Sequence, residues 1–469
     1  MAVNILANIE DTTSGNSSGS WTNVPGLSVT GKTVQGTGSV VLIVASIAII
    51  EEADSTAQYR IMVNGSATAS PVITAFSDDT NEANTATIAL AVDGLSGSSN
   101  SFSVQWYTLT GTPSKETSAN SSFLVLEITE NATIEVDMAS TSSANPSASF
   151  TDLFASGNIT IAGTSSVIIM IGHAQITGSG DTAIDFQFSV DGTEEGAITG
   201  MFSDTVNGMN GWSGIHVLDG LSAGTHTFEL AYRDSLGTPT LATAQQRTFQ
   251  VIEISSGAAL ESSIISSASH SAAASWGDDG ALDATVNVAS TASTLLHIAN
   301  VAIDDPAPDE SAAFRLAIDD AHEGAELTQF LDFSSGTSRT LLVAAKTGLS
   351  AGNHTFALQW YELQTDAQAD TTRPRSQFVI EFTGIAYKLE GVTKDKDGSV
   401  LGSCECYCFK DNGDNTLSYI GYDLSDGSGN YSITGIGDNS AAYLVVAWKD
   451  NSPHVMDVTD HVLQPVVDS

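Results

Sequence analysis

The stretch GLSAGNHTFALQW, residues 348–360, decides the fold because it occurs three times in the 469-residue chain. Residues 220–232 read GLSAGTHTFELAY, and a looser copy runs from GLSG at 94–97 into FSVQW at 102–106. Each copy is a glycine- and serine-rich turn followed by alternating apolar and polar residues, which is the pattern of a half-buried antiparallel strand. The first glycines of the copies are 126 and 128 residues apart, so the chain contains a long tandem repeat.

Four further landmarks recur in the same order in each repeat. They are an aromatic residue before a polar turn (20–23, 149–152 and 275–278), a long apolar strand (40–45, 167–171 and 294–298), a strand ending in Asn-Gly, Asp-Gly or Asp-Asp (59–65, 186–192 and 314–320), and a closing strand (123–128, 249–254 and 378–382). We expect the aromatic of the first landmark to be buried and the third landmark to end in a tight hairpin turn. The motif aligns Phe102 with Phe228 and Phe356, and Trp106 with Tyr232 and Trp360; these strands are expected to form cores or a threefold seam.

Each repeat has room for about eight short strands, which favours a β-sandwich or jelly roll. The repeat pattern resembles the C1q/TNF-like jelly rolls that are common in phage and bacterial surface proteins, and the likeness covers residues 1 to about 384. The resemblance implies a threefold arrangement, either as a homotrimer or as an intrachain pseudo-trimer of the three repeats. We predict an all-β chain with jelly-roll repeats at 1–129, 130–256 and 257–384.

The sequence pattern changes after about residue 385, where strand-like segments alternate with Asp/Gly/Asn turns. Five of the fifteen basic residues lie in this last part: Lys388, Lys394, Lys396, Lys410 and Lys449. The order of GVT at 391–393, DG at 397–398, GNYSI at 429–433 and YLVVA at 443–447 resembles the carboxypeptidase-regulatory-like, transthyretin-like sandwich. The resemblance implies an Ig-like or transthyretin-like interaction domain at 385–469 with no chemistry of its own.

Charge and composition restrict the partners. Fifteen basic against 55 acidic residues give a net charge of −40, which repels phosphate backbones and argues against direct nucleic-acid binding. The N-terminal residues lack a basic and apolar signal pattern, and the most apolar run, residues 40–50, is too short to span a bilayer. We therefore expect no membrane insertion and a protein made in the cytoplasm, or exported without a classical signal.

The recurring histidines, His226 and His354, are the first candidates for catalysis. They stand beside a glycine turn, where an imidazole can bond loop backbone, and no nucleophile motif lies nearby. The first repeat has no histidine at this place. We predict a structural role for both and no catalytic residue in the chain.

Cysteines and acidic loops are the remaining candidates for sites. Cys404, Cys406 and Cys408 would share one face of a strand, poorly placed for a disulfide, so we predict buried free thiols. Clustered oxygens at Asp-rich positions leave calcium open as an alternative to ordinary turns. These positions are the turns 395–398 and 411–415, and Asp54, Asp304, Asp305, Asp309 and Glu310 in the jelly rolls. Our prediction is no metal, no cofactor and no cofactor-binding residue.

These patterns predict a non-enzymatic structural protein of a virus particle, most simply a bacteriophage head decoration, fibre or tail-associated subunit. It would be assembled in the host cytoplasm among other virion structural proteins and exposed on the particle surface. A receptor- or glycan-binding adhesin, on a phage fibre or a cell surface, is the alternative. A hydrolase would need clustered acids in a cleft, which sequence does not reveal.

Overall fold

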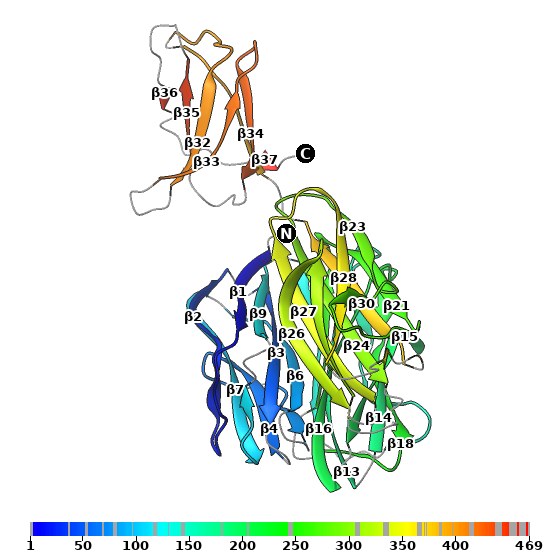
Figure 1. Ribbon diagram of the computed structural model, residues 1–469. Helices are drawn as coiled ribbons and strands as arrows, with labels where there is room; N and C mark the ends of the chain where they lie inside the picture. Colours follow the sequence, from blue (N-terminus) through cyan, green and yellow to red (C-terminus); the bar gives the residue numbers. More distant parts are fainter. Residues whose placement is uncertain are drawn as a thin grey trace. The chain divides into compact units, whose positions relative to one another are not determined.

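A computed structural model describes residues 3–467 with the exception of 36–37, 52–54, 68–69, 78–81, 96, 116–119, 130, 142–145, 180–181, 204–205, 243–246, 305–309, 332–336, 364–367, 370, 372, 384–386, 396, 412–416, 437–442, 450–456 and 459–465. The chain divides into two compact units, Met1–Phe382 and Thr383–Ser469. All regular elements in the described residues are β-strands, which confirms the all-β prediction (Figure 1). In the described part of the chain, no helix has the length and apolarity needed to cross a bilayer.

Each repeat of the first unit is a sandwich of two antiparallel sheets. In each case the first, last, third and sixth long strands form one sheet, named the inner sheet here, and the others form the outer sheet. The inner sheet of repeat 1 contains β1 (Val3–Asp11), β9 (Ser121–Ile128), β3 (Val40–Glu51) and β6 (Glu82–Val92), with β8 (Ser114–Lys115) beside β3. Its outer sheet contains β2 (Thr22–Val34), β7 (Gly97–Thr110), β4 (Ser55–Val63) and β5 (Ile73–Ser77).

Repeats 2 and 3 have the same strand order. The inner sheet of repeat 2 contains β10 (Ala132–Ser140), β20 (Arg247–Ile254), β13 (Val167–Ser179), β16 (Val206–Leu218) and the short β19 (Thr240–Leu241). Its outer layer contains β11 (Thr151–Ala155), β18 (Phe228–Leu236), β14 (Thr182–Val190) and β15 (Thr193–Ser203), with the pair β12 (Ile159–Ile161) and β17 (Gly224–His226).

In repeat 3 the inner sheet contains β21 (Ala258–Ser266), β30 (Arg375–Phe382), β24 (Thr294–Asp304), β27 (Thr337–Thr347) and β29 (Gln368–Ala369). The outer sheet contains β22 (Gly277–Asp278), β23 (Ala284–Val288), β28 (Gly352–Glu362), β25 (Glu310–Ile318) and β26 (Ala321–Leu331). The first strands β1, β10 and β21 also share a register shift near their middle. The repeat therefore extends to local irregularities of the sheets.

The predicted hairpin turns are confirmed where the structure describes them. Asp191 and Gly192 have φ values of 52° and 71° and connect β14 to β15, and Asp319 and Asp320, with φ values of 50° and 65°, connect β25 to β26. Two successive residues with positive φ are the geometry of a type I′ hairpin turn, which suits Asn, Asp and Gly.

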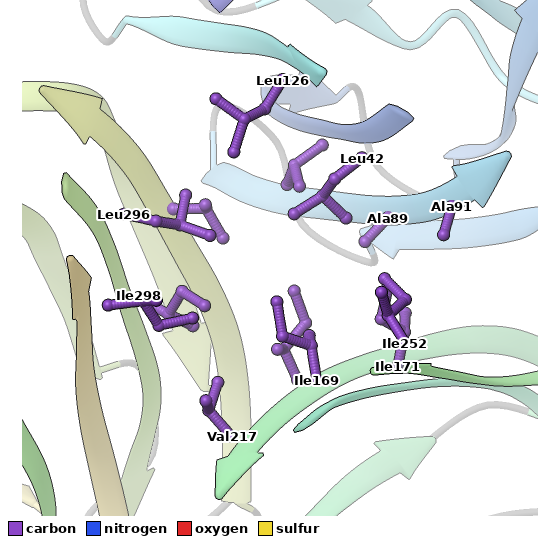
Figure 2. Packing of buried hydrophobic residues seen from close by; sticks show 14 of the residues in the cluster. Leu42, Ala89, Ala91, Leu126, Ile169, Ile171, Val217, Ile252, Leu296 and Ile298 are labelled. Carbon is purple, nitrogen blue, oxygen red and sulfur yellow. The ribbon is translucent and has the colours of Figure 1, made fainter. Parts of the chain in front are cut away.

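The three inner sheets share one hydrophobic cluster, named the central cluster here. Among the described residues it contains 24 buried side chains, drawn from all three repeats. Figure 2 shows equivalent side chains from the three sheets converging, including Leu42, Ile169 and Leu296. Alternate residues of the same strands, such as Ile43 and Ile168, belong to the sandwich cores instead. The long apolar strands are thus buried on both faces, which explains why their sequences show no polar alternation.

The aromatic strands of the repeated motif fill the sandwich cores. Phe102 and Trp106 on β7 belong to the core of repeat 1, and Phe356 and Trp360 on β28 belong to cores of repeat 3. They lie in the outer sheets, so the aliphatic strands, not these aromatics, line the central cluster.

The second unit contains two further sheets. One contains β34 (Asn430–Ile436), β31 (Tyr387–Val392) and β37 (Val466–Val467), and the other contains β33 (Leu417–Leu424), β32 (Glu405–Asp411), β35 (Tyr443–Trp448) and β36 (Asp457–Val458). Its core includes Leu389, Ile433 and Val445 together with the three cysteines.

Candidate functional site

The two motif histidines each bridge an aspartate and a backbone carbonyl. His354 Nδ1 lies 2.6 Å from Asp319 Oδ2, and its Nε2 lies 2.9 Å from the Ser350 carbonyl oxygen. His226 repeats this arrangement with Asp191 at 2.7 Å and the Ser222 carbonyl at 2.9 Å. Carboxylate and carbonyl oxygens only accept hydrogen bonds, so this geometry favours the protonated ring, in which both nitrogens donate, and it raises the pKa of both histidines above the ordinary value of 6.5.

Both sites have the residue types of a catalytic triad, and in one of them the serine hydroxyl also contacts the histidine. Ser350 Oγ lies 3.3 Å from His354 Nε2, opposite Asp319 on Nδ1. A general base needs a free lone pair on Nε2, whereas here Nε2 also faces the Ser350 carbonyl oxygen at 2.9 Å, which favours a proton on that nitrogen. The arrangement therefore holds the turn and offers no base for a serine nucleophile.

In the first repeat, two asparagines stand at the positions of the aspartate and the histidine. Asn64 Nδ2 donates to Asn100 Oδ1 at 2.9 Å, and Asn64 Oδ1 accepts from the Ser101 N–H at 2.8 Å. Asp191 and Asp319 accept the equivalent N–H groups of Thr227 and Thr355. Two amides have no acid–base function at neutral pH, so the feature that all three repeats share is the tie between turn and strand.

Replacing Asp319 by Asn should lower the pKa of His354. The hydrogen bond to Asp319, followed by that to the Ser350 carbonyl, raises this pKa above its ordinary value of 6.5. Asn tolerates positive φ, so the turn is retained while the charge is lost. The folded-state pKa lies above the unfolded one, so the stabilisation is present below pH 6.5 and lost as pH rises through the folded value. Proton NMR titration of the His354 C2–H measures the shift; unchanged titration would contradict it, and His226 is the internal control.

The three cysteines are free and buried, as predicted. Burial raises the pKa of the Cys406 and Cys408 thiols to about 11. Their thiolate population at pH 8 should therefore be lower than that of an exposed cysteine by roughly a hundredfold or more. We expect iodoacetamide to label the native protein slowly and the unfolded protein at once, as read by mass spectrometry. Rapid labelling of the native chain would contradict the buried placement.

Among the Asp-rich positions, the 395–398 turn shows turn geometry, whereas Asp304, Glu310 and Asp411 are the end residues of strands β24, β25 and β32. Asp395 Oδ1 accepts the N–H groups of Asp397 and Ser399 at 2.9 and 2.8 Å, which is the local bonding typical of such turns. Asp54, Asp305, Asp309 and residues 412–415 lie outside the described residues. Among the described side chains, no group of three or more His, Cys, Asp or Glu could hold a metal ion.

Polar side chains that border the central cluster form hydrogen bonds between the repeats. Ser46, His173 and Asn300 occupy matching register on β3, β13 and β24, opposite Ser122, Thr248 and Ser376. His173 Nε2 lies 2.5 Å from the Ala89 carbonyl oxygen in repeat 1. Asn300 Nδ2 donates to the Ile215 carbonyl in repeat 2 at 2.7 Å, and Ser46 Oγ donates to the Leu341 carbonyl in repeat 3 at 3.4 Å.

These contacts connect the repeats in cyclic order, from repeat 2 to 1, from 3 to 2 and from 1 to 3. Heterologous contacts of this kind form a ring when the rotation closes. Gln250 adds a two-sided contact, because its side-chain amide both accepts from and donates to the backbone of Ala91 at 2.9 Å. Buried polar groups with fixed partners select one arrangement of the sheets.

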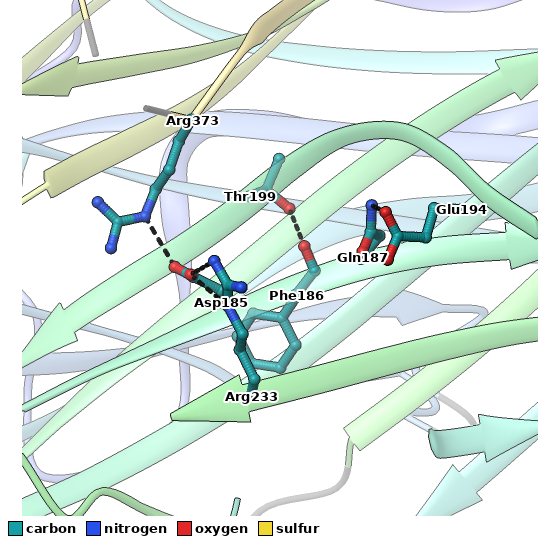
Figure 3. A network of polar contacts seen from close by, with 7 residues as sticks. All are labelled: Asp185, Phe186, Gln187, Glu194, Thr199, Arg233 and Arg373. Atoms are coloured by element: carbon teal, nitrogen blue, oxygen red, sulfur yellow. Dashed lines mark hydrogen bonds and ion pairs between the residues drawn. The ribbon is translucent and has the colours of Figure 1, made fainter. Parts of the chain in front are cut away.

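An ion cluster joins repeats 2 and 3 as well. Asp185 is 1% exposed and accepts hydrogen bonds from Arg233, at 3.0 and 2.9 Å, and from Arg373 at 2.8 Å (Figure 3). Arg233 belongs to the same sandwich, whereas Arg373 precedes β30 of repeat 3. Two guanidinium groups on a buried carboxylate satisfy the charge that burial would otherwise penalise.

The interface positions were not anticipated from the sequence, although a signal was present. Each of these polar residues is the last residue of an apolar run at the same step of the repeat. The runs are VVLIVAS at 40–46, VIIMIGH at 167–173 and TLLHIAN at 294–300. A polar residue recurring at one step of a strand buried on both faces indicates a contact that needs hydrogen bonding.

Close backbone approach also marks the interface. A Cβ at Gly211 on β16 would lie 2.4 Å from Ile73 Cγ2 and 2.9 Å from the Thr74 backbone on β5 of repeat 1. Only glycine permits the two strands to approach so closely.

Comparisons with known proteins add little to this geometry. No protein-family model and no curated protein matches the chain. Similar solved structures include a GH2 β-galacturonidase from Eisenbergiella tayi (12% identity, TM-score 0.12, covering 39% of this chain and 34% of that one). Others are a triple jelly-roll protein from the turret assembly of an archaeal virus (10%, 0.17, 75% and 82%) and a protein of infectious bursal disease virus, Gx strain (8%, 0.18, 80% and 82%). The chain spans about a third of the length of the glycosidase, and similarity at this level carries no argument about function.

Proposed function

We propose that this chain is a non-enzymatic structural protein of a virus particle, and that its three jelly rolls close a trimer-like body within one polypeptide. The observation that carries the proposal is the central cluster with its cyclic polar contacts. A shared core of this kind makes three domains one rigid block, which suits a role in assembly.

The surface chemistry supports the same role. A net charge of −40 keeps the protein soluble and disfavours nucleic acid as a partner. The ring nitrogens of His226 and His354 are engaged with acceptors, so these groups are not available for general-base chemistry. The resemblance of the repeats to C1q/TNF-like jelly rolls of phage surface proteins directs the proposal to a bacteriophage, as head decoration, fibre or tail-associated subunit exposed on the particle after assembly in the host cytoplasm.

Locating the chain on the particle tests the proposal. Particles of the virus that encodes this chain would be purified, their proteins quantified by mass spectrometry, and the subunit located by cryo-electron microscopy with an antibody fragment bound to it. We expect a fixed stoichiometry relative to the shell protein and density at defined positions. Absence of the chain from purified particles would overturn the proposal.

A glycan-binding adhesin is the second candidate, favoured by paired aromatic residues on two outer sheets. In repeat 1 the Arg60 guanidinium lies 4.0 Å from the centre of the Trp21 ring, which lies 5.6 Å from the Tyr107 ring. Repeat 3 has the same set, with Arg315 at 4.2 Å from Trp276 and Trp276 at 5.5 Å from Tyr361. The expectation that the aromatic of the first landmark is buried is only partly met, because Trp21 and Trp276 are half-buried beneath arginines.

Half-exposed rings beside planar polar groups can stack on sugars and bond their hydroxyls. Glycan-array binding at micromolar affinity that is lost in the Trp21→Ala and Trp276→Ala double variant would support the adhesin. Equal binding by this variant would show that other surfaces are responsible.

A further inference from the structure

One face of the C-terminal sheet exposes an unusual number of large apolar side chains. On its edge strand β33, Leu417, Tyr419, Tyr422 and Leu424 are 53, 58, 55 and 53% exposed. Trp448 on β35 is 38% exposed. We name these five residues, with Tyr407 and Phe409 of β32 between them, the aromatic face.

The strand registers place these residues side by side across the sheet. Tyr407 is opposite Tyr422, and their rings are stacked with centroids 5.7 Å apart. Phe409 is opposite Tyr419, with the rings edge-on at 5.8 Å. The other side of β32 points Cys406 and Cys408 into the core. The aromatic face is therefore a continuous outer surface and not a misplaced core.

Exposing these apolar side chains to water is energetically unfavourable for a protein that has no partner bound. Contiguous exposed apolar residues mark interaction sites, and tyrosine, tryptophan and phenylalanine are enriched at the centres of protein interfaces. The strand β33 is also at the edge of its sheet, bonded to β32 alone among the described strands. Both properties indicate that a partner covers this surface.

Charge distinguishes between the possible occupants. Glu405 and Asp411 lie on this face at opposite ends of β32, beside Leu424 and Leu417, and no described side chain on the face is basic. A second copy placed face to face by a twofold axis would bring carboxylates against carboxylates. A partner with arginine or lysine at its rim would pair with both ends.

Composition separates a protein partner from a glycan. Leu417 and Leu424 are exposed at both ends of β33, and aliphatic side chains contribute neither stacking nor hydrogen bonds to a sugar. The Tyr407 and Tyr422 rings also cover part of each other's faces. An apolar recess in a protein fits all of these residues.

We propose that the aromatic face docks this chain onto another structural protein of the particle, one that presents an apolar recess bordered by arginine or lysine. The inference rests on the proposed function, since the partner is a component of the same particle. The interaction is non-covalent, with the aromatic residues as its centre and Glu405 and Asp411 as its rim.

The test uses virus lacking the gene, grown in host cells that supply the full chain from a plasmid. Three variants are compared with wild type. Tyr419→Ser with Tyr422→Ser removes the centre, Glu405→Lys with Asp411→Lys inverts the rim, and Val392→Ser with Val400→Ser is the matched control, since these valines are 46 and 50% exposed outside the aromatic face. Copies per particle are measured by quantitative mass spectrometry, and thermal melting verifies folding of each purified chain.

We expect the centre and rim variants to reduce copies per particle by about tenfold or more, with the control at the wild-type level. Both variants incorporated at the wild-type level would overturn the inference while leaving the proposed function intact. Wild-type chain absent from particles would overturn the proposed function and the inference with it. Equal loss in the valine control would also count against docking by this face.

Discussion

Acidification from about pH 7.5 to about pH 4.5 should lower the thermal midpoint of the first unit by roughly 10 °C or more. Burial lowers the pKa of three histidines, His173, His216 and His297, to about 4. The unfolded chain takes up protons near the ordinary value of 6.5, where the folded chain does not. Stability is therefore full above that value and is lost as pH falls toward 4.

The size of the effect follows from the shift. A pKa difference of this kind is equivalent to roughly 3 kcal/mol for each histidine once the unfolded form is fully protonated. Two of the three lie against neighbouring repeats: His173 contacts the Ala89 carbonyl, and His216 lies edge-on to Phe378 at 5.2 Å. Acid should therefore weaken the contacts between repeats first. His226 and His354, whose pKa values are raised, act in the opposite direction.

Repeat 3 supplies the matched control for this prediction. Asn300 is the equivalent of His173 and bonds the backbone of the neighbouring repeat through its amide. His173→Asn should retain that contact without titrating, so the acid-dependent loss should fall by about a third. Calorimetry of both proteins at several pH values measures it. A midpoint that is flat down to pH 4.5, or a variant as acid-sensitive as wild type, would contradict the account.

Replacing Ile169 by Asp should destabilise the first unit by more than about 4 kcal/mol. Ile169 is fully buried in the central cluster, among apolar side chains of the three repeats. The charge would separate the inner sheets, and the sandwiches would move apart while retaining their own cores. Urea unfolding by tryptophan fluorescence measures the stability, and small-angle X-ray scattering measures the expansion.

Two substitutions calibrate this result. Ile169→Val removes one methyl group from the cluster and should cost about 1 kcal/mol. Ile265→Asp places the same charge at a residue that is 44% exposed and should be nearly neutral. If Ile169→Asp unfolds at the wild-type urea concentration and scatters as wild type does, the central cluster does not hold the repeats together.

The sequence predicts the architecture well because repetition multiplies weak local signals. Alternating strands such as residues 228–232 and the Asp-Gly turn at 191–192 define the sandwich by short-range rules. The apolar runs at 40–45 and 167–171 also indicate strands, but they do not say what covers their second face. That information depends on how the sheets meet, which lies beyond the range of a local pattern.

Sites proved harder to predict than strands. His226 and His354 recur in the motif, yet their equivalent in repeat 1 is Asn100, whose partner Asn64 is connected to it by no sequence motif. Strict alternation along β33 would place Tyr419 and Tyr422 on opposite faces of the sheet. The bulge between β32 and β33 puts both on the outer side. Side-chain chemistry alone did not identify these contacts because they depend on register.

The cyclic contacts between the repeats predict that one polypeptide closes the threefold ring that three chains would otherwise form. Native mass spectrometry of the purified full-length chain, with its collision cross-section, tests this most directly. We expect a monomer of 48.6 kDa at micromolar concentration, with the three repeats of Met1–Phe382 packed as one body. A stable trimer of chains at three times this mass, or an extended monomer with separated domains, would contradict it.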